Sequence, residues 1–454
     1  MQKTLNMCEG SLFKKTILFT VPIMLTGILQ LLFNAADLII VGRFCGSNSV
    51  AAVGATSSLI NLIVNLFIGL STGSGVAVAR AIGASDEECV KQTVHTAIPT
   101  ALVSGLVVSV IGFFVSKPIL NLMGVPGDIL PLSSLYLKIY FCGMLFNMVY
   151  NFGASILRAA GDSRSPLVFL TLAGIINVVL NVLFVTVFDW NVAGVAAATS
   201  ISQVVSAVLV VRALMKRTDA CKLNLKDIKF MKRPLYVILS IGIPSGIQST
   251  VFSLSNVIIQ SSINSFGNVA MSGSAAAGNI EGFLYIILNA FHQTSLNFSG
   301  QNSGAGKFDR VKKTFFVCSM YVAIIGLACG VGMYLMGEKL LLIYLPNDPK
   351  AIEYGMIRFT YILFPYFLCG LMEVATGAIR GMGSSFTTMI ISIIGVCAFR
   401  VVWIFTIFRI EEFHSLHGLF VSYPISWTVS FLAQLIAFRF VLRKRQRIQQ
   451  KTRE

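Results

Sequence analysis

The sequence predicts an all-α polytopic membrane protein: twelve transmembrane helices in two pseudo-symmetric six-helix lobes around a central cavity. Hydrophobic residues make up 55% of the 454-residue chain and charged residues only 12%, whereas soluble domains carry roughly 25% charged residues. Apolar runs recur along the whole chain, each long enough to cross a bilayer as a helix. The segment 78–93 returns in recognisable form as 299–314, which indicates an internal duplication.

The apolar runs lack the alternation of barrel strands and are rich in glycine, alanine and serine, the residues that let membrane helices pack closely. The first run is too long for a signal peptide and has no small-residue cleavage site, so we expect it to be retained. The twelve expected spans are 16–41, 49–79, 90–115, 133–157, 166–188, 192–214, 235–266, 269–298, 311–336, 351–379, 386–408 and 416–441.

The predicted organisation is an N-terminal lobe at 1–218, a cytoplasmic linker at 219–229 and a C-terminal lobe at 230–454 that ends in a basic cytoplasmic tail. Most lysines and arginines fall on alternate loops and on the two tails, which predicts that both termini are cytoplasmic. The net charge of +16 therefore reflects topology and anionic lipid rather than nucleic-acid binding. The nine cysteines form no C-x-x-C pair and are expected to be free thiols.

Asp37 is the strongest candidate for a functional acid inside a span. It shares one face of the first helix with Gln30 and Asn34, and Pro22 frees a backbone carbonyl earlier in the same helix. A carboxylate near the bilayer centre costs about 2.5–3.5 kcal/mol and needs a partner, a wet cavity or a proton. The alternative is that Asp37 lies near the exterior end of its span and only snorkels or caps.

The fifth and sixth spans carry amides and a hydroxyl. Asn177 and Asn181 lie one turn apart, and Thr199 is in the next span. These groups are hard oxygen ligands that suit Na⁺, and they can equally orient a protonatable carboxylate. The alternative is that they only join neighbouring helices, at about 0.6 kcal/mol each.

Glu281, Glu373 and Arg400 lie on separate spans of the second half, and we expect Arg400 to pair with one of the two acids. The alternative is a role in binding a proton or a cationic substrate. No metal site, cofactor or catalytic cluster is expected, because the chain has no paired-acid motif, no phosphate loop and no catalytic serine, histidine and aspartate set. Energy must then come from an ion gradient or be absent.

These motifs resemble those of the bacterial branch of the MATE (multidrug and toxic compound extrusion) family across the whole chain. The resemblance rests on Pro22 with Asp37, on Gly-Gln-Asn-x-Gly-Ala-Gly at 300–306, and on the duplicated Arg-x-x-Gly elements at 158–161 and 380–383. It implies a bacterial inner-membrane monomer, open to one side, that exports cationic or amphipathic drugs in exchange for H⁺ or Na⁺ by alternating access of its lobes.

The resemblance also implies site residues. They are a cation site at Asp37, Asn177, Asn181 and Thr199, hinges at Pro22 and Pro244, and a substrate cavity lined by Gln30, Phe33, Asn34 and Asn256. Many relatives carry aspartate where this chain has Asn181, and sodium-coupled relatives often carry an acid where it has Ser253. Both departures favour proton coupling over Na⁺. The competing interpretation is a lipid or lipid-linked-sugar flippase of the same superfold.

Overall fold

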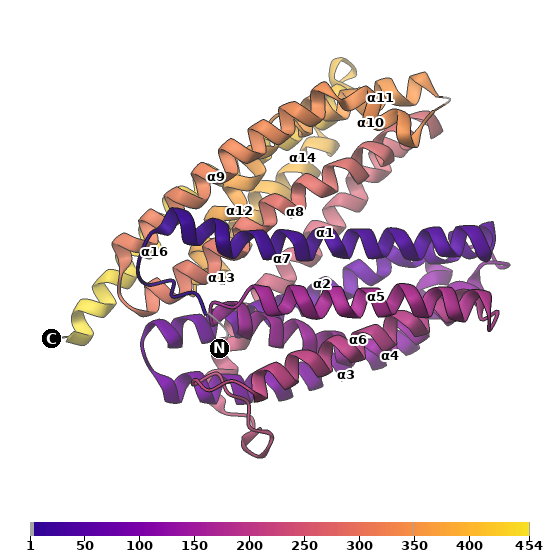
Figure 1. Cartoon of the computed structure of the whole chain (residues 1–454). Helices are drawn as coiled ribbons and strands as arrows, with labels where there is room; N and C mark the ends of the chain where they lie inside the picture. Colours follow the sequence, from indigo (N-terminus) through magenta and orange to yellow (C-terminus); the bar gives the residue numbers. More distant parts are fainter. Residues whose placement is uncertain (1–3, 347, 454) are drawn as a thin grey trace. The chain divides into compact units, whose positions relative to one another are not determined.

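The computed structural model describes residues 4–346 and 348–453, which form helices and no strand (Figure 1). The apolar runs of the first half become helices because only a helix satisfies all its backbone hydrogen bonds within one membrane-spanning segment. These helices are α1 (Leu12–Phe44), α2 (Ser47–Gly83), α3 (Glu87–Leu122), α4 (Leu130–Ala159), α5 (Arg164–Thr186) and α6 (Asn191–Met215).

The second half repeats the pattern with more interruptions. It comprises α7 (Lys232–Asn264), α8 (Asn268–Gly304), α9 (Phe308–Leu335), α10 (Gly337–Tyr344), α11 (Pro349–Ile362), α12 (Tyr366–Gly381), α13 (Ser385–Ser392), α14 (Phe399–Phe405), α15 (Leu416–Phe420) and α16 (Ser422–Arg453). The helices α11 and α12 form one predicted span that bends by 46°. A π-helical segment, Ile393–Ala398, joins α13 to α14.

Among the described residues, ten helices are long and apolar enough to cross a membrane, and the bent pair α11–α12 makes an eleventh. Helix α8 covers the remaining predicted span. At 37 residues it is long enough to cross a membrane. It is less apolar than the other spans because it contains the buried polar residues Glu281, His292, Asn297 and Gln301. The prediction of an all-α membrane protein is confirmed.

The chain forms two compact units that exchange the beginnings of their first helices. Among the described residues, unit 1 contains 4–6 and 25–246, and unit 2 contains 7–24, 247–346 and 348–453. The predicted lobes, 1–218 and 230–454, differ from these units because the start of α1 packs with C-terminal helices and the start of α7 packs with N-terminal ones. The predicted linker, 219–229, is part of unit 1.

Glycines explain how α7 begins inside unit 1. A side chain at Gly69 or Gly73 of α2 would collide with the backbone of α7 near Gly246 and Gly242, so the two helices cross at backbone contact. Helix α4 packs against both α3 and α6, as Figure 1 shows. In unit 2, the start of α1 meets α8 through a 2.8 Å hydrogen bond between the hydroxyls of Thr20 and Thr294.

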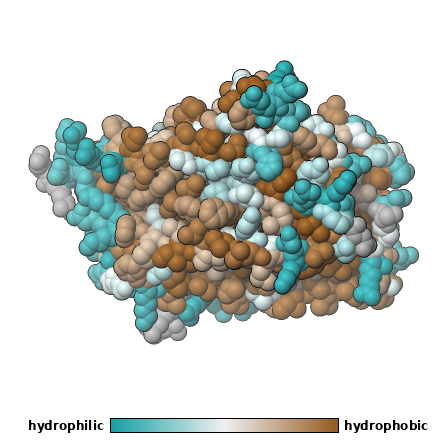
Figure 2. Space-filling view, turned by 90° about the horizontal axis from the view of Figure 1, so that it is seen from above, coloured by the Kyte–Doolittle hydropathy of each residue, from teal (hydrophilic) through white to brown (hydrophobic). Residues whose placement is uncertain are grey.

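The outer surfaces carry apolar side chains, as a lipid-facing protein requires. On α5, for example, Val168, Leu172, Ile175 and Val179 recur at helical spacing and are between 45% and 60% exposed. Figure 2 shows hydrophobic side chains over much of the face that it draws. Exposed apolar area of this extent would be an aggregation liability in a soluble protein.

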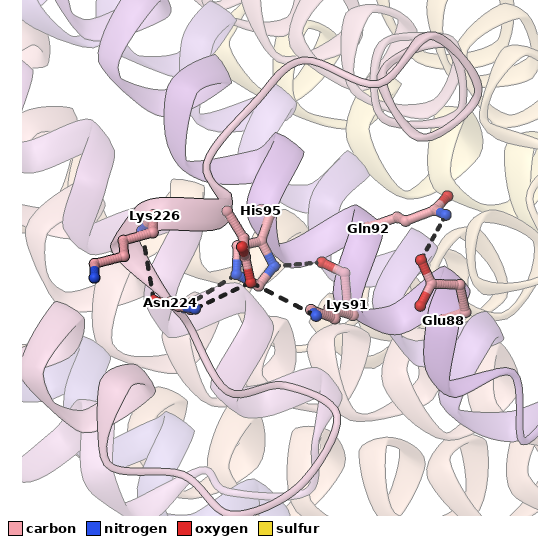
Figure 3. A network of polar contacts seen from close by, with 7 residues as sticks. Glu88, Lys91, Gln92, His95, Asn224 and Lys226 are labelled. Carbon is pink, nitrogen blue, oxygen red and sulfur yellow. Dashed lines mark hydrogen bonds and ion pairs between the residues drawn. The ribbon is translucent and has the colours of Figure 1, made fainter.

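The predicted linker is fastened to the start of α3 (Figure 3). The Asn224 backbone N–H donates to His95 Nε2 at 3.0 Å, while His95 Nδ1 donates to the Lys91 carbonyl at 2.7 Å. Lys91 also lies 3.6 Å from the Asp227 carboxylate. Since one ring nitrogen donates and the other accepts, His95 is neutral in this arrangement.

A second contact, an ion pair between Arg217 and Asp219, lies at the start of the linker. Arg217 Nε donates to Asp219 Oδ1 at 2.8 Å, and Arg217 Nη2 pairs with Oδ2. Burial acts to raise the pKa of the Asp219 carboxyl, but the hydrogen bonds and charge of Arg217 outweigh it and hold that pKa below its usual value. The linker is therefore an ordered segment within unit 1.

Candidate functional site

The predicted cation site is assembled in unit 1. Helix α1 presents Asp37, α5 presents Asn177 and Asn181 one turn apart, and α6 presents Thr199. The Asn181 amide donates to Asp37 Oδ1, and it also lies 3.3 Å from Asn177 Oδ1. Asn177 and Thr199 are joined by a 3.3 Å hydrogen bond. The four side chains therefore form one connected network across three helices.

The hydrogen-bond network decides how the Asn177 amide is oriented, because its oxygen and nitrogen have nearly the same shape. When its Nδ2 faces Asp37, it donates to Oδ1 at 2.9 Å, and its own oxygen accepts from the hydroxyl and the backbone N–H of Thr199, both at 3.3 Å. In this orientation the Asn181 amide no longer donates to Asn177, because the Asn177 nitrogen now occupies that position. Asp37 Oδ1 then receives two amide donors.

The other carboxylate oxygen, Asp37 Oδ2, accepts no hydrogen bond from the described residues. No lysine, arginine or histidine in the described ranges forms an ion pair with this half-buried carboxylate. Asn181 is fully buried, and its Oδ1 also has no partner in the described part of the chain. The site thus offers oxygens to a proton or cation and holds no basic residue that competes for them.

Two tyrosines of α4 lie near Asp37 and were not among the predicted site residues. Tyr136 and Tyr140 stack with ring centroids 6.2 Å apart and an interplanar angle of 18°. Both interact electrostatically with the Asp37 carboxylate. They lie one helical turn apart on α4, and this spacing was the only sequence signal for them.

The predicted cavity residues fall into two groups. Gln30 and Asn34 of unit 1 are exposed, as is Asn256 of unit 2, and exposure is what a cavity-lining role requires. Phe33 is half-buried because its ring packs on Gly174 of α5, where no Cβ would fit. A shared substrate cavity formed by these residues stays a prediction.

The predicted hinges lie close to the places where the chain passes between units. Pro22 precedes the first residue of the 25–246 segment by three positions (25 − 22), and Pro244 precedes Ile247 by the same number (247 − 244). Both prolines are buried inside long helices. A proline removes one helical hydrogen bond and favours a bend at that position.

The predicted partner of Arg400 is wrong. Glu281 of α8 binds Arg358 of α11 through two hydrogen bonds, at 2.9 Å from Nε and 2.8 Å from Nη2. Arg358 Nη1 donates to Ser274 at 2.8 Å. A planar guanidinium matches a carboxylate in this two-bond geometry. Arg358 lies inside the predicted span 351–379, and spacing in the sequence does not indicate that it faces Glu281.

Glu373 of α12 is also matched with a base other than Arg400. Its Oε2 lies 3.0 Å from His292 Nδ1, which also lies 2.8 Å from the Glu373 carbonyl. Arg400 instead donates from Nε to Ser426 at 2.9 Å, and its guanidinium lies over the Tyr423 ring at 3.9 Å. Glu281 and Glu373 are therefore each paired within unit 2, whereas no basic residue among the described residues pairs with Asp37 of unit 1.

Comparisons with known proteins agree with this architecture. A family model described as MatE matches residues 22–183 and 244–406, once in each half of the duplication. The chain belongs to the MatE family. MatE proteins are transporters rather than enzymes, and the expectation that this chain is not an enzyme is confirmed at the family level.

The curated relatives cover almost the whole chain. Probable multidrug resistance protein YoeA of Bacillus subtilis is 28% identical over 446 residues, which is 96% of each chain. Multidrug export protein MepA of Staphylococcus saprophyticus is 22% identical over 437 residues, covering 96% of this chain and 95% of that protein.

Solved structures share the fold. A MATE protein crystallised in complex with MaL6 superposes with a TM-score of 0.91 at 21% identity, over 98% of this chain and all of that chain. An outward-facing multidrug resistance MATE transporter of the MOP superfamily gives a TM-score of 0.91 at 21% identity, over 98% and 99% of the two chains. At this identity the match establishes the architecture.

Proposed function

We propose that this MatE transporter is a secondary multidrug exporter that exchanges cationic or amphipathic small molecules for protons by alternating access of its two lobes. Its location would be the inner membrane of a bacterium, as a monomer among lipids with both termini cytoplasmic. The names of the curated relatives, a multidrug resistance protein and a multidrug export protein, support the substrate class. The geometry at Asp37 supports the coupling.

The observation that carries the coupling proposal is the free oxygen of Asp37. Its Oδ1 is held by amides, while Oδ2 has no donor among the described residues and no cation pairs with the carboxylate. An acid of this kind inside a membrane can bind and release a proton without breaking an ion pair. Each inward proton supplies about 2.3 kcal/mol per 100 mV and about 1.4 kcal/mol per pH unit.

Protons fit the site better than Na⁺. Asn181 turns an N–H toward Asp37, not an oxygen, and a hard cation prefers a shell of several oxygens. A Na⁺ ion bound at Asp37 would require the Asn181 amide to rotate, with Asn177 and Thr199 supplying the remaining oxygens. With one carboxylate in the set, a proton needs no rearrangement.

Pro22 and Pro244 are proposed as the hinges of the alternating movement. Each lies just before the point where its helix passes from one compact unit to the other. A proline at such a point lets the helix bend where a helical hydrogen bond is missing. Replacing either proline with alanine is expected to slow export while leaving drug binding in place.

The test is dye efflux from everted vesicles, with a pH gradient and a Na⁺ gradient imposed separately. We expect the pH gradient to drive export by the native protein. The Asp37→Asn variant should insert and bind substrate but lose at least 90% of gradient-driven export, because it cannot titrate. Asp37→Glu should retain part of the activity.

The matched control is Asp128→Asn, which removes an exposed acid from the turn between α3 and α4 and should leave export unchanged. Export by Asp37→Asn at the native rate would refute proton coupling through this residue. Export driven only by the Na⁺ gradient would show that the coupling ion is Na⁺ and not a proton.

A further inference from the structure

The start of α9 and the end of α16 lie next to each other in unit 2. The rings of Phe315 and Phe438 stack with centroids 4.7 Å apart. Farther toward the C-terminus, a Cβ at Gly306 would collide with the Gln449 side chain, and Gly306 lies two residues before α9 begins (308 − 306). Because the start of α9 meets the end of α16, the two helices run antiparallel here (Figure 1).

Exposed apolar side chains flank the stacked rings. Phe316 of α9 is 66% exposed, and Ile436 and Phe440 of α16 are 72% and 69% exposed. The two residues of α16 continue an exposed apolar row that includes Val429 and Leu432. Apolar surface of this extent marks the part of a membrane protein that contacts lipid acyl chains.

The exposed surface becomes basic close to the stacked rings. Lys312 precedes Phe315 by three residues, and Arg443 follows Phe438 by five (315 − 312 and 443 − 438). At about 1.5 Å per residue, they lie about 4.5 Å and about 7.5 Å from the level of the rings, toward the same end of unit 2. At about 100° per residue, in opposite senses on antiparallel helices, Lys312 and Arg439 turn toward the same side of the contact.

Little negative charge from the chain balances these basic side chains. The sequence has no aspartate or glutamate from 413 to 453. Lys312 Nζ lies 2.9 Å from Asp309, but both side chains are exposed, and such pairs contribute little. Arg439 and Arg443 are exposed and take part in no ion pair within the described ranges. The surface therefore keeps a net positive charge.

The equivalent position in unit 1 receives a carboxylate from the chain itself. Lys91 of α3 precedes Lys312 by 221 residues (312 − 91), which is the offset of the internal duplication. Lys91 lies 3.6 Å from Asp227 of the linker. The described part of unit 2 has no such linker, because α16 continues as a helix to Arg453. A negative group from outside the chain can take the place that Asp227 has in unit 1.

We propose that an anionic phospholipid docks on this surface, with its phosphate among the basic side chains and an acyl chain along the apolar ones. The α9–α16 surface consists of Lys312, Arg439, Arg443, Phe316, Ile436 and Phe440. Basic residues just beyond a membrane-spanning helix attract anionic headgroups, and guanidinium groups match phosphate oxygens. The adjoining apolar row favours a lipid over a soluble anion, a nucleic acid or an acidic protein.

A tryptophan in place of Phe316 reports the docked lipid. The Phe316→Trp protein carries Trp190→Phe and Trp403→Phe and is held in nanodiscs of phosphatidylcholine. The same protein with Phe316 retained gives the background emission. Brominated phosphatidylglycerol should reach half-maximal quenching at a mole fraction at least tenfold lower than brominated phosphatidylcholine, since each basic residue near the surface contributes about fivefold.

The preference should depend on the basic side chains alone. Lys312→Gln/Arg439→Gln/Arg443→Gln should bring phosphatidylglycerol to the level of phosphatidylcholine. Quenching by brominated phosphatidylcholine should stay unchanged in this variant, because the apolar side chains remain. The matched control is Lys222→Gln, which removes an exposed lysine of the linker and should keep the full preference.

Glycerol phosphate, which has the phosphate without acyl chains, should not reverse the quenching. Reversal at an equal concentration of phosphate would mean a site for a soluble anion and would overturn the proposal. Equal half-maximal mole fractions for the two brominated lipids would also overturn it, and this comparison is made in protein that retains all three basic residues. A preference for phosphatidylglycerol that persists in the folded triple variant would refute the assignment to this surface.

Discussion

In unit 1 the carboxylate of Asp37 receives only neutral amide donors, whereas in unit 2 Glu281 and Glu373 are each matched with a base. The two halves descend from one duplicated sequence, and their scaffolds remain similar. The polar groups inside them have diverged. A carboxylate without a basic partner can exchange protons freely, while a carboxylate in an ion pair is held charged and mainly joins helices.

The largest expected effect is the loss of stability when the α8–α11 pair is broken. Glu281→Gln leaves Arg358 buried without its carboxylate, which should cost about 3–5 kcal/mol. The double variant Glu281→Leu/Arg358→Leu removes both charges and should recover most of that loss. Thermal unfolding in detergent measures both variants. A Glu281→Gln protein as stable as the native one would show that the pair is not structural.

The next effect concerns Glu373 and His292. Glu373→Gln replaces the carboxylate that accepts from His292 with a neutral amide and should lower the free energy of unfolding by about 1–3 kcal/mol. Proton-driven export by the folded protein should persist, since Asp37 carries the coupling. Vesicle efflux at matched protein levels tests this. Loss of proton-driven export in a Glu373→Gln variant of native stability would mean that Glu373 of unit 2, and not Asp37 of unit 1, carries the proton.

Asn181→Asp tests the cation site of unit 1 by adding a second carboxylate to it. A second carboxylate beside Asp37 adds an oxygen ligand and a negative charge, so apparent Na⁺ affinity should rise about tenfold, equivalent to about 1.4 kcal/mol. Na⁺-dependent thermal stabilisation reports this affinity. Asn121→Asp, at an exposed position near the end of α3, is the matched control for added charge. An unchanged Na⁺ response in Asn181→Asp would mean that the side chain is not part of the cation site.

The smallest effect is expected in the linker. Asp219 has a lowered pKa in the folded protein, so its pair with Arg217 contributes stability above the unfolded value of about 3.9, and this contribution is lost as the pH falls through the folded value. Because Asp219 is half-exposed, Asp219→Asn should cost only about 0.2–1 kcal/mol at neutral pH. The difference from native protein should shrink at acidic pH. A constant difference across the pH range would contradict the ion pair.

The sequence predicted the fold because membrane helices are encoded by local apolar runs. The grouping of Asp37, Asn177, Asn181 and Thr199 was implied by the resemblance to the MATE family, whereas helical spacing alone placed only Asn177 and Asn181 on one face. The sequence failed to predict the partner of Arg400. Which acid meets which base depends on the facing of separate helices, and neither Arg358 nor the His292 pairing could be located from spacing alone.

The exchange of helix ends between units was also beyond sequence reasoning. A lobe boundary at 219–229 follows the polar linker, but residues 7–24 and 232–246 join units according to tertiary packing. The glycines at 69, 73, 242 and 246 were visible as small residues in apolar runs. Their pairing across α2 and α7 required the structure.

The most direct test of the central claim is proton release on drug binding. Purified protein in weakly buffered detergent is mixed with a cationic substrate, and a pH-sensitive dye reports the protons released. The account predicts release by the native protein and by Glu281→Leu/Arg358→Leu, and none by a folded Asp37→Asn variant that still binds the substrate. Undiminished proton release from that Asp37→Asn variant would contradict the account.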